Sequence, residues 1–371
     1  MYLSVPHRGL SSREADDVAD GARLALSDSG SRAGGRSLRL VELDSAGPDG
    51  DTWDPSVVEE NAKRAAKDAT AVAYIGELDY GGSAISVPVT NAEGILQVSP
   101  LDGLTELTKP PTQGIKAGPE RYFPSGKRNF VRLVPSDFAE AAALVAWARE
   151  RGARKVAIVH DGLLFGRELA TQVAAAAETA GIKVTDTKEF EAKQDSDGYA
   201  GLAGDITSGK PDAVIYTGLA RPGSGRMLDQ VERAQPGVPL YGSRALARQA
   251  GEGAGLPSVD VLSPVLPARL YPRSGRDVLR RLTRQRGETV EADALYGYDA
   301  MRIVLEALDL AARRDRADER AGVVDAALQP RTRRSVLGSF AVTPSGEPAP
   351  QRFGAYRRDG TRLVFEGVRK P

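Results

Sequence analysis

The chain has 371 residues, too many for one ordinary domain, and this length predicts two lobes of similar size. Its 50 basic and 50 acidic residues give a formal net charge of +0, so neither nucleic acid nor an anionic membrane surface is favoured as the main partner. The basic cluster Arg331–Arg334 is interpreted as solvated surface. The absence of cysteine and the presence of only two histidines exclude disulfides, thiolate catalysis, zinc–thiolate sites and multi-histidine metal centres.

No apolar run approaches the roughly 20 residues that cross a bilayer, so the composition is typical of a soluble protein. Met1 is followed directly by the strand-like stretch YLSV, and no signal peptide is recognisable. Two interpretations stay open at this point. The protein is either cytoplasmic, or the chain begins after an export segment that has been removed.

Short apolar runs alternate with helical patterns along most of the chain. Ala15, Val18, Ala22 and Ala25 form one helical stripe of apolar residues. The runs are of the kind that is buried on both faces of a parallel sheet. They are Leu38–Leu43, Ala71–Ile75, Leu96–Ser99, Lys155–Val159, Lys183–Phe190, Ala213–Tyr216 and Val259–Ser263. This alternation predicts an α/β fold with helices on both faces of its parallel sheets.

Two segments resemble each other. Thr70–Gly76 reads TAVAYIG and Asp212–Gly218 reads DAVIYTG, and each precedes a loop, a helix, a second glycine and another short strand. Two α/β halves of similar architecture would explain this similarity. Chance similarity among β-α-β units is the alternative.

The last part of the chain has a different pattern. Helices are predicted over Gly275–Arg286, Leu295–Arg313 and Glu319–Ala327. The three segments that follow alternate like antiparallel strands, with Asp359-Gly360 as a hairpin turn. They are Val336–Val342, Arg352–Arg357 and Thr361–Glu366.

The motifs of common α/β enzymes are missing. Neither of the glycine-rich loops that cradle phosphates is present, and G-x-S-x-G is absent too. His160-Asp161 follows a predicted buried strand, where α/β folds place ligands, but no nucleophile can be named beside it. A structural or cleft-lining role is therefore favoured over catalysis there, and His7 is equally ambiguous. We expect no enzyme activity, no cofactor and no metal.

An ordered series of motifs resembles a known family. Ala73–Thr108 contains YIG, a serine-containing loop, EGI, VSP and ELT in succession. NFVRLVPSD, KVAIVHD with FGRELA, PDAVIYTG, LYGS, YGYDAM and VLGSFAVTPSGEP follow in register over nearly the whole chain. This series is similar to the type I periplasmic binding proteins, in the branch that includes the leucine/isoleucine/valine-binding proteins of ABC transporters.

The resemblance implies two Rossmann-like lobes joined by a three-strand hinge, with a ligand held in the cleft between the lobes. Lobe 1 would comprise residues 1–134 and 264–335, and lobe 2 would comprise residues 135–263 and 336–371. The ligand would lie at strand ends and helix N-termini, where backbone N–H groups can bind a carboxylate. Closure of the hinge would bury it.

The resemblance also places the ligand-binding residues, and several of them depart from the amino-acid-binding pattern. Tyr80 stands where a serine is usual, Leu219 stands where a tyrosine is expected, and Arg244 stands where an acidic residue meets an α-ammonium group. The positions carried over are Tyr80, Gly81, Ser83, Leu101, Asp102, Gly103, Asp161, Phe165, Leu219, Arg244 and Asp293.

Arg244 is the sharpest departure. A buried guanidinium without a partner costs several kcal/mol, so it should face an anion that belongs either to the protein or to the ligand. A ligand carboxylate held by Arg244 and an ion pair with Asp102 or another acid are both open. In either case the clamp for α-amino acids is lost or inverted.

The function that the resemblance implies is an extracytoplasmic solute-binding protein of an ABC importer. Such a protein binds a small polar molecule, either an amino acid or a small carboxylate, and delivers it to the membrane permease. We expect a monomer that is periplasmic or lipid-anchored and that binds no nucleic acid. A ligand-sensing or regulatory module of the same fold is the alternative.

Overall fold

The structure is a computed structural model that describes residues 1–9, 11–47, 53–78, 81–110, 118–191, 199–221, 223–249, 257–317, 319–359 and 362–371. The chain forms two compact units. Unit 1 comprises residues 1–136 and 267–350, and unit 2 comprises residues 137–266 and 351–371. Each unit therefore takes its elements from two separate segments of the sequence.

Unit 1 is built on a five-stranded parallel sheet with the order β4-β1-β5-β6-β7. Its strands are β1 (Tyr2–Val5), β4 (Val41–Asp44), β5 (Ala73–Ile75), β6 (Leu96–Ser99) and β7 (Phe130–Arg132). Every residue of β1, β5, β6 and β7 is buried, as a sheet covered on both faces requires. Because these strands are parallel, the loops that follow β5 and β6 meet at one edge of the sheet.

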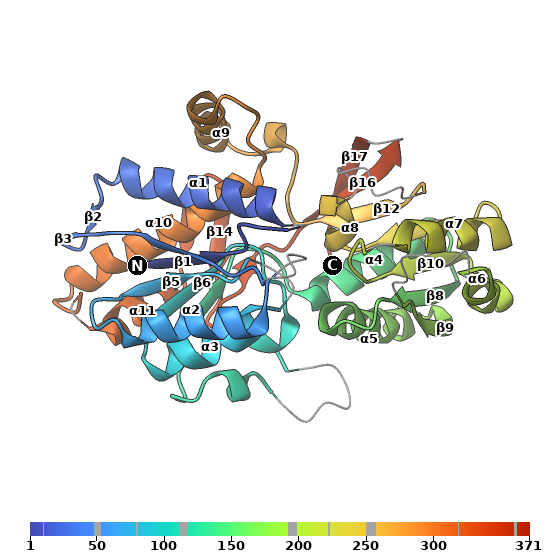
Figure 1. Ribbon diagram of the computed structural model, residues 1–371, viewed down its shortest axis with the longest axis horizontal. Coiled ribbons are helices and arrows are strands. Elements are labelled where there is room, and N and C mark those ends of the chain that lie inside the picture. The colour runs from blue at the N-terminus through green and yellow to red at the C-terminus, as the bar shows by residue number, and fades with distance from the viewer. Residues whose placement is uncertain are drawn as a thin grey trace. The chain divides into compact units, whose positions relative to one another are not determined.

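Helices cover both faces of this sheet. Figure 1 shows α1 (Ser12–Asp28) and α10 (Asp293–Ala312) on one face, and α2 (Pro55–Lys67) and α3 (Ser83–Ala92) on the other. Sequence chemistry fixes the start of α2: Pro55 occupies its first turn, and the Asp54 carboxylate accepts hydrogen bonds from the N–H groups of Ser56 (2.8 Å) and Val57 (3.1 Å). The helices α1, α2 and α3 belong to the first sequence segment of unit 1, and α10 belongs to the second. Both segments therefore contribute helices that cover the sheet.

Two glycines let α1 and α10 approach closely. A Cβ atom on Gly297 would lie 1.9 Å from the carbonyl oxygen of Val18, and one on Gly21 would lie 1.9 Å from that of Ala294. Neither carbonyl can move without displacing its helix. The two helices can therefore pack at this distance only because both positions lack a side chain.

We expect Gly297→Ala to lower the free energy of unfolding by about 2 kcal/mol, because the added methyl group forces the two helix backbones apart. Urea denaturation followed by circular dichroism measures the loss. Gly201→Ala is the control: it lies inside α6 (Tyr199–Ser208) with open space around it and should stabilise the chain by about 0.5–1 kcal/mol. Equal stability of Gly297→Ala and the wild type would contradict the close packing.

The remaining described elements of unit 1 include a hairpin, a small antiparallel sheet and two further α-helices. The β2–β3 hairpin joins Arg32–Ala33 to Arg36–Ser37, and a three-stranded antiparallel sheet has the order β13-β14-β15. The other elements are η1 (Thr105–Leu107), η2 (Pro119–Tyr122), η4 (Ala268–Leu270), α9 (Arg273–Arg286), α11 (Arg320–Leu328), β13 (Thr332–Ser335), β14 (Gly338–Val342) and β15 (Pro348–Ala349).

Unit 2 is built on a seven-stranded sheet with the order β17-β16-β12-β11-β10-β8-β9. The five strands from β12 to β9 are parallel, and β16 and β17 complete the sheet as an antiparallel hairpin. The strands are β8 (Lys155–His160), β9 (Lys183–Glu189), β10 (Ala213–Tyr216), β11 (Leu240–Gly242), β12 (Asp260–Ser263), β16 (Phe353–Asp359) and β17 (Arg362–Arg369). The turn predicted at Asp359-Gly360 reaches outside the described residues.

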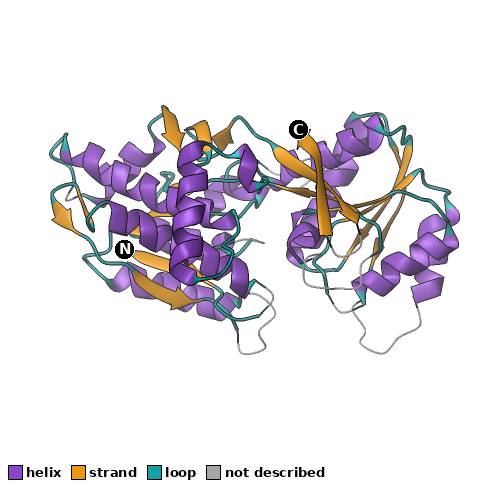
Figure 2. Ribbon diagram, turned by 90° about the horizontal axis from the view of Figure 1, so that it is seen from above, coloured by secondary structure: helices purple, strands orange, loops and turns teal. Residues whose placement is uncertain are grey.

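Helices pack on both faces of this sheet as well (Figure 2). Leu240 belongs to the core under α6 and α7 (Ser224–Ala234). The next residue, Tyr241, points to the opposite face, where its ring lies 5.3 Å from that of Trp147 on α4 (Asp137–Glu150). The other helices among the described residues of unit 2 are α5 (Leu164–Thr179) and α8 (Arg244–Gln249).

The two similar sequence segments form β5 and β10, each of which lies inside the sheet of its unit and is followed by a helix and then by the adjacent strand. The units differ from the predicted lobes by a few residues at 135–136 and 264–266 and by one longer segment. Residues 336–350 belong to unit 1, because β14 pairs with β13 and β15 there and not with the sheet of unit 2. None of the described helices combines the length and the apolar character that crossing a membrane requires.

Candidate functional site

In unit 1 five of the predicted ligand-binding residues lie in the loops after β5 and β6 or at the start of α3, namely Gly81, Ser83, Leu101, Asp102 and Gly103. Asp102 joins these loops. Its Oδ1 accepts hydrogen bonds from the N–H groups of Gly81 (3.1 Å) and Leu104 (3.0 Å), and its Oδ2 accepts one from the N–H of Ser83 (2.9 Å). The Asp102 side chain is 0 % exposed. Its carboxylate therefore connects the first residue of α3 to the loop that follows β6.

The neighbours of these residues have equally specific contacts. The Ser83 hydroxyl accepts a hydrogen bond from the Glu77 N–H at 3.1 Å, and Leu101 is buried beside Asp102. Gly103 completes the buried loop. Tyr80 lies outside the described residues, so its predicted role remains a prediction.

Glu77 lies beneath this loop and was not among the predicted residues. Its carboxyl group accepts hydrogen bonds from the hydroxyls of Tyr74 (2.6 Å) and Ser4 (2.8 Å). Burial raises the pKa of Glu77 to about 7, with the charge of Asp102 adding a smaller contribution in the same direction. The signal in the sequence was available, because Glu77 lies two residues after the buried strand β5, in the kind of position that singled out Asp161 after β8.

Asp293 is the first residue of α10 and is buried, and its predicted role in ligand binding stays a prediction. Its charge acts on Asp17 of α1, whose pKa is raised to about 6, mainly by burial.

In unit 2 Arg244 lies at the start of α8 and is buried against two acids of α4. Its Nη1 lies 2.5 Å from Asp137 Oδ1 and 2.5 Å from Glu140 Oε2, and its backbone N–H donates to Glu140 Oε1 at 2.7 Å. The guanidinium carbon lies 4.8 Å from the centre of the Phe165 ring. Arg244 thus faces an anion, as the sequence requires, and the anions include Asp137 and Glu140 of the protein, neither of which was named beforehand.

Asp161 plays a comparable part in the neighbouring loops. Its Oδ2 accepts a hydrogen bond from the N–H of Leu219 at 2.9 Å, which ties the loop after β8 to the loop after β10. A Cβ on Gly218 would lie 2.8 Å from the Asp161 side chain, so the two loops are in close contact. The unit 2 residues Asp161, Phe165, Leu219 and Arg244 accordingly all lie at or beside the loops that follow β8, β10 and β11.

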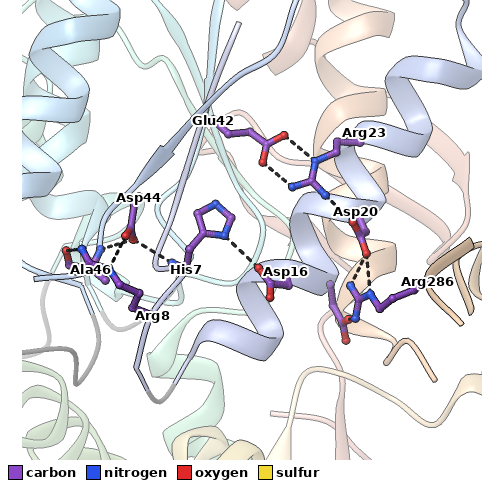
Figure 3. Close-up of polar contacts among 10 residues, drawn as sticks. His7, Arg8, Asp16, Asp20, Arg23, Glu42, Asp44, Ala46 and Arg286 are labelled. Carbon is purple, nitrogen blue, oxygen red and sulfur yellow. Dashed lines mark hydrogen bonds and ion pairs between the residues drawn. The ribbon is translucent and has the colours of Figure 1, made fainter. Parts of the chain in front are cut away.

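The two histidines have local partners. His160 Nδ1 accepts a hydrogen bond from the Gly162 N–H at 3.1 Å, within its own turn. His7 Nδ1 lies 3.1 Å from Asp16 Oδ1 on α1. Figure 3 shows the two side chains facing each other. Within the described part of the chain, no group of three or more His, Asp or Glu side chains is arranged to hold a metal ion.

A groove of about 810 Å³ runs along α1 and α9 in unit 1. Charged side chains that line it pair with one another and with nearby strands (Figure 3). Arg286 of α9 lies 2.5 Å from Asp17 and donates to Asp20, while Arg23 donates to both carboxylate oxygens of Glu42 at 2.6 Å. These ion pairs connect α1 to α9 and to β4. The charged residues of the groove therefore stabilise the packing of unit 1.

The family model for periplasmic binding proteins matches residues 3–354, a range that runs through both units. The chain belongs to the periplasmic binding protein family. This family is made of substrate-binding proteins, which are not enzymes. No curated protein sequence matches this binding protein.

Solved structures share its fold. A leucine-binding protein from Thermotoga maritima is 18 % identical with a TM-score of 0.80, and the match covers 100 % of this chain and 98 % of that one. An ABC transporter substrate-binding protein from Desulfitobacterium hafniense, in complex with Leu, is 19 % identical with a TM-score of 0.75 and 99 % coverage of both chains. A solute-binding protein from R. palustris in complex with benzoate is 18 % identical with a TM-score of 0.76, covering 100 % and 96 %.

The type I periplasmic binding protein fold predicted from the sequence is therefore confirmed. In this binding protein the buried charges described at the strand ends are held by groups of their own unit: Asp102 by backbone N–H groups and Arg244 by two carboxylates.

Proposed function

We propose that this binding protein is the extracytoplasmic solute-binding component of an ABC importer. The match to the family model over residues 3–354 carries this proposal, because it includes both α/β units that the family uses to bind a solute. The solute would contact the loops after β5 and β6 in unit 1 and the loops after β8, β10 and β11 in unit 2. Parallel α/β sheets bind ligands at this carboxyl edge.

The proposed partner is the membrane permease of the importer, to which the loaded protein delivers its solute as a monomer. The solved relatives support a small-molecule ligand, since their structures contain leucine and benzoate. At 18–19 % identity they support the class of function and leave the identity of the solute to experiment.

A thermal-shift screen over amino acids, amines, amides, polyols and aromatic acids tests the proposal. A true solute at 100 times its Kd should add about 2.7 kcal/mol of stability, because it binds only the folded protein. Isothermal titration calorimetry with the hit should then give one site per chain. A covalent change in the hit after incubation with the protein would contradict a pure binding role.

Uptake experiments separate transport from sensing. Cells that lack this protein should lose uptake of the labelled hit and regain it when the wild-type chain is supplied. Unchanged uptake in such cells, together with confirmed binding in vitro, would favour a ligand-sensing role for the same fold.

A further inference from the structure

The start of α3 in unit 1 is already occupied by an anion of the protein itself. The first N–H groups of a helix have no partner within the helix and carry partial positive charge, so helix N-termini commonly bind carboxylates and phosphates. Here the N–H of Ser83, the first residue of α3, donates to Asp102 Oδ2 at 2.9 Å, and the N–H of Gly81 donates to Asp102 Oδ1 at 3.1 Å.

The next two N–H groups of the helix also have acceptors. Ala84 donates to the carbonyl oxygen of Gly81 at 3.0 Å, and Ile85 donates to that of Gly82 at 3.0 Å. Together with Gly81 and Ser83, four donors at this helix start are engaged. The N–H groups of Gly81 and Ser83 now donate to the Asp102 carboxylate. A solute carboxylate could bind them only by displacing Asp102.

Displacement of Asp102 is opposed by the surrounding loop. The Asp102 N–H donates to the Ser99 hydroxyl at 3.0 Å, and that hydroxyl donates to the Glu77 carbonyl oxygen at 2.7 Å. Arg132 Nη1 donates to the Leu104 carbonyl oxygen at 2.8 Å on the other side of the loop. An expelled Asp102 carboxylate would also leave its three N–H donors and move through a buried environment, which is costly for a charge.

Charge opposes an incoming anion as well. The Asp102 carboxylate is held by neutral backbone N–H groups, and it lies close enough to Glu77 to contribute to the raised pKa of that carboxyl group. In unit 2 the buried guanidinium of Arg244 lies within 2.5 Å of both Asp137 and Glu140, so that cluster holds more acids than cations among these three residues. Arg132, the cation that contacts the Asp102 loop, pairs with Glu347 at 3.4 Å, so neither cluster offers a surplus of positive charge to a carboxylate.

We propose that Asp102 is a specificity-determining residue that stands in for a ligand carboxylate at the start of α3. The solute of this protein is accordingly bound through uncharged or cationic polar groups, such as amides, hydroxyls or amines, and needs no carboxylate. This inference rests on the proposed solute-binding function. It distinguishes this chain from a protein that selects amino acids or aromatic acids by their carboxylate.

Chemical rescue tests the role of Asp102 without knowledge of the solute. Asp102→Ala removes the atoms of one formate ion from the buried loop. Sodium formate should raise the melting temperature of this variant by about 2–4 °C, since one regained kcal/mol shifts a protein of this unit size by that amount. Formate should not raise the melting temperature of the wild type, and sodium chloride at equal concentration should rescue neither protein.

Asp54→Ala is the matched control, because Asp54 also caps a helix of unit 1 with its carboxylate but does so at the surface. Water can replace the lost carboxylate there, so formate should have no effect. If Asp102→Ala does not fold, Asp102→Asn provides the second variant, and formate should leave its melting temperature unchanged because the amide still fills the site. Stabilisation of the wild type by formate, or failure of formate to rescue a folded Asp102→Ala, would overturn the inference.

Matched solute pairs test the specificity directly and separate it from the proposed function. For a hit from the screen, the carboxamide or alcohol counterpart should bind within 10-fold of the carboxylate or more tightly. A preference of 100-fold or more for the carboxylate overturns the inference while it supports solute binding. A successful formate rescue in a protein that binds no solute supports the role of Asp102 and contradicts the proposed function.

Discussion

Arg244→Met is expected to destabilise unit 2 by about 3–5 kcal/mol. The substitution keeps much of the volume of the side chain but leaves the carboxylates of Asp137 and Glu140 buried without the cation that they now contact at 2.5 Å. Removal of one partner from a buried ion cluster costs this much because the remaining charges have lost water without compensation. Burial already raises the pKa of Glu140. Loss of the guanidinium should raise that pKa further.

The chain offers a convenient probe for this measurement. Trp53 and Trp147 are its only tryptophans, and they lie in unit 1 and unit 2, respectively. In a Trp53→Phe background, urea denaturation followed by tryptophan fluorescence reports on Trp147, which lies on the same helix as Asp137 and Glu140. The expected result is a lower midpoint with an unchanged slope.

Two further variants identify the cause. Adding Asp137→Asn and Glu140→Gln to Arg244→Met removes both stranded charges, so the triple variant should be more stable than Arg244→Met alone. Lys188→Met breaks an ion pair of unit 2 with Asp186 in solvent, and its midpoint should match the wild type. A loss below about 1 kcal/mol for Arg244→Met would mean that the cluster is not a net source of stability.

The fold could be predicted from the sequence because strands that are buried on both faces leave a simple pattern. Leu96–Ser99 and Ala213–Tyr216 were predicted with the bounds that β6 and β10 have in the structure. The antiparallel region was harder. Val336–Val342 was predicted as one strand, but β13 ends at Ser335 and β14 begins at Gly338, because alternation of residue types does not mark a tight turn.

The candidate site could be predicted only in part. The cost of burying a charge required an anion near Arg244, but its partners Asp137 and Glu140 precede it by 107 and 104 residues and are brought to it by the packing of α4. Asp102 was predicted only from the resemblance to the family. Its actual hydrogen bonds go to backbone N–H groups, which every residue but proline has and which therefore leave no signature in the sequence.

Glu77→Gln is expected to change how the stability of the chain depends on pH. Burial raises the pKa of Glu77 from 4.5 to about 7, so the folded protein keeps a proton that the unfolded chain releases near pH 4.5. Between these two values the unfolded state binds fewer protons than the folded state. The free energy of unfolding contributed by Glu77 is therefore fully present below pH 4.5, falls by about 3 kcal/mol as the pH rises to 7, and is then constant.

Glutamine removes this titration while it keeps the shape of the side chain. Its carbonyl oxygen can accept from the Tyr74 hydroxyl, and its amide can donate to the hydroxyl oxygen of Ser4, the two groups that now hydrogen-bond to Glu77. The difference in unfolding free energy between Glu77→Gln and the wild type should thus grow by about 3 kcal/mol between pH 4.5 and pH 7.5 in favour of the variant. Urea denaturation at a series of pH values measures it.

A second buried acid provides the comparison that makes the result specific. Burial raises the pKa of Asp299 to about 7 as well, and its titration is present in both proteins, so it cancels when the two curves are subtracted. Asp299→Asn should produce a difference curve of the same sign from a different part of unit 1, and the double variant should show the sum of both. Parallel pH profiles for the wild type and Glu77→Gln would mean that Glu77 is ionised in the folded protein throughout this range, with its charge stabilised beneath the loop that Asp102 holds.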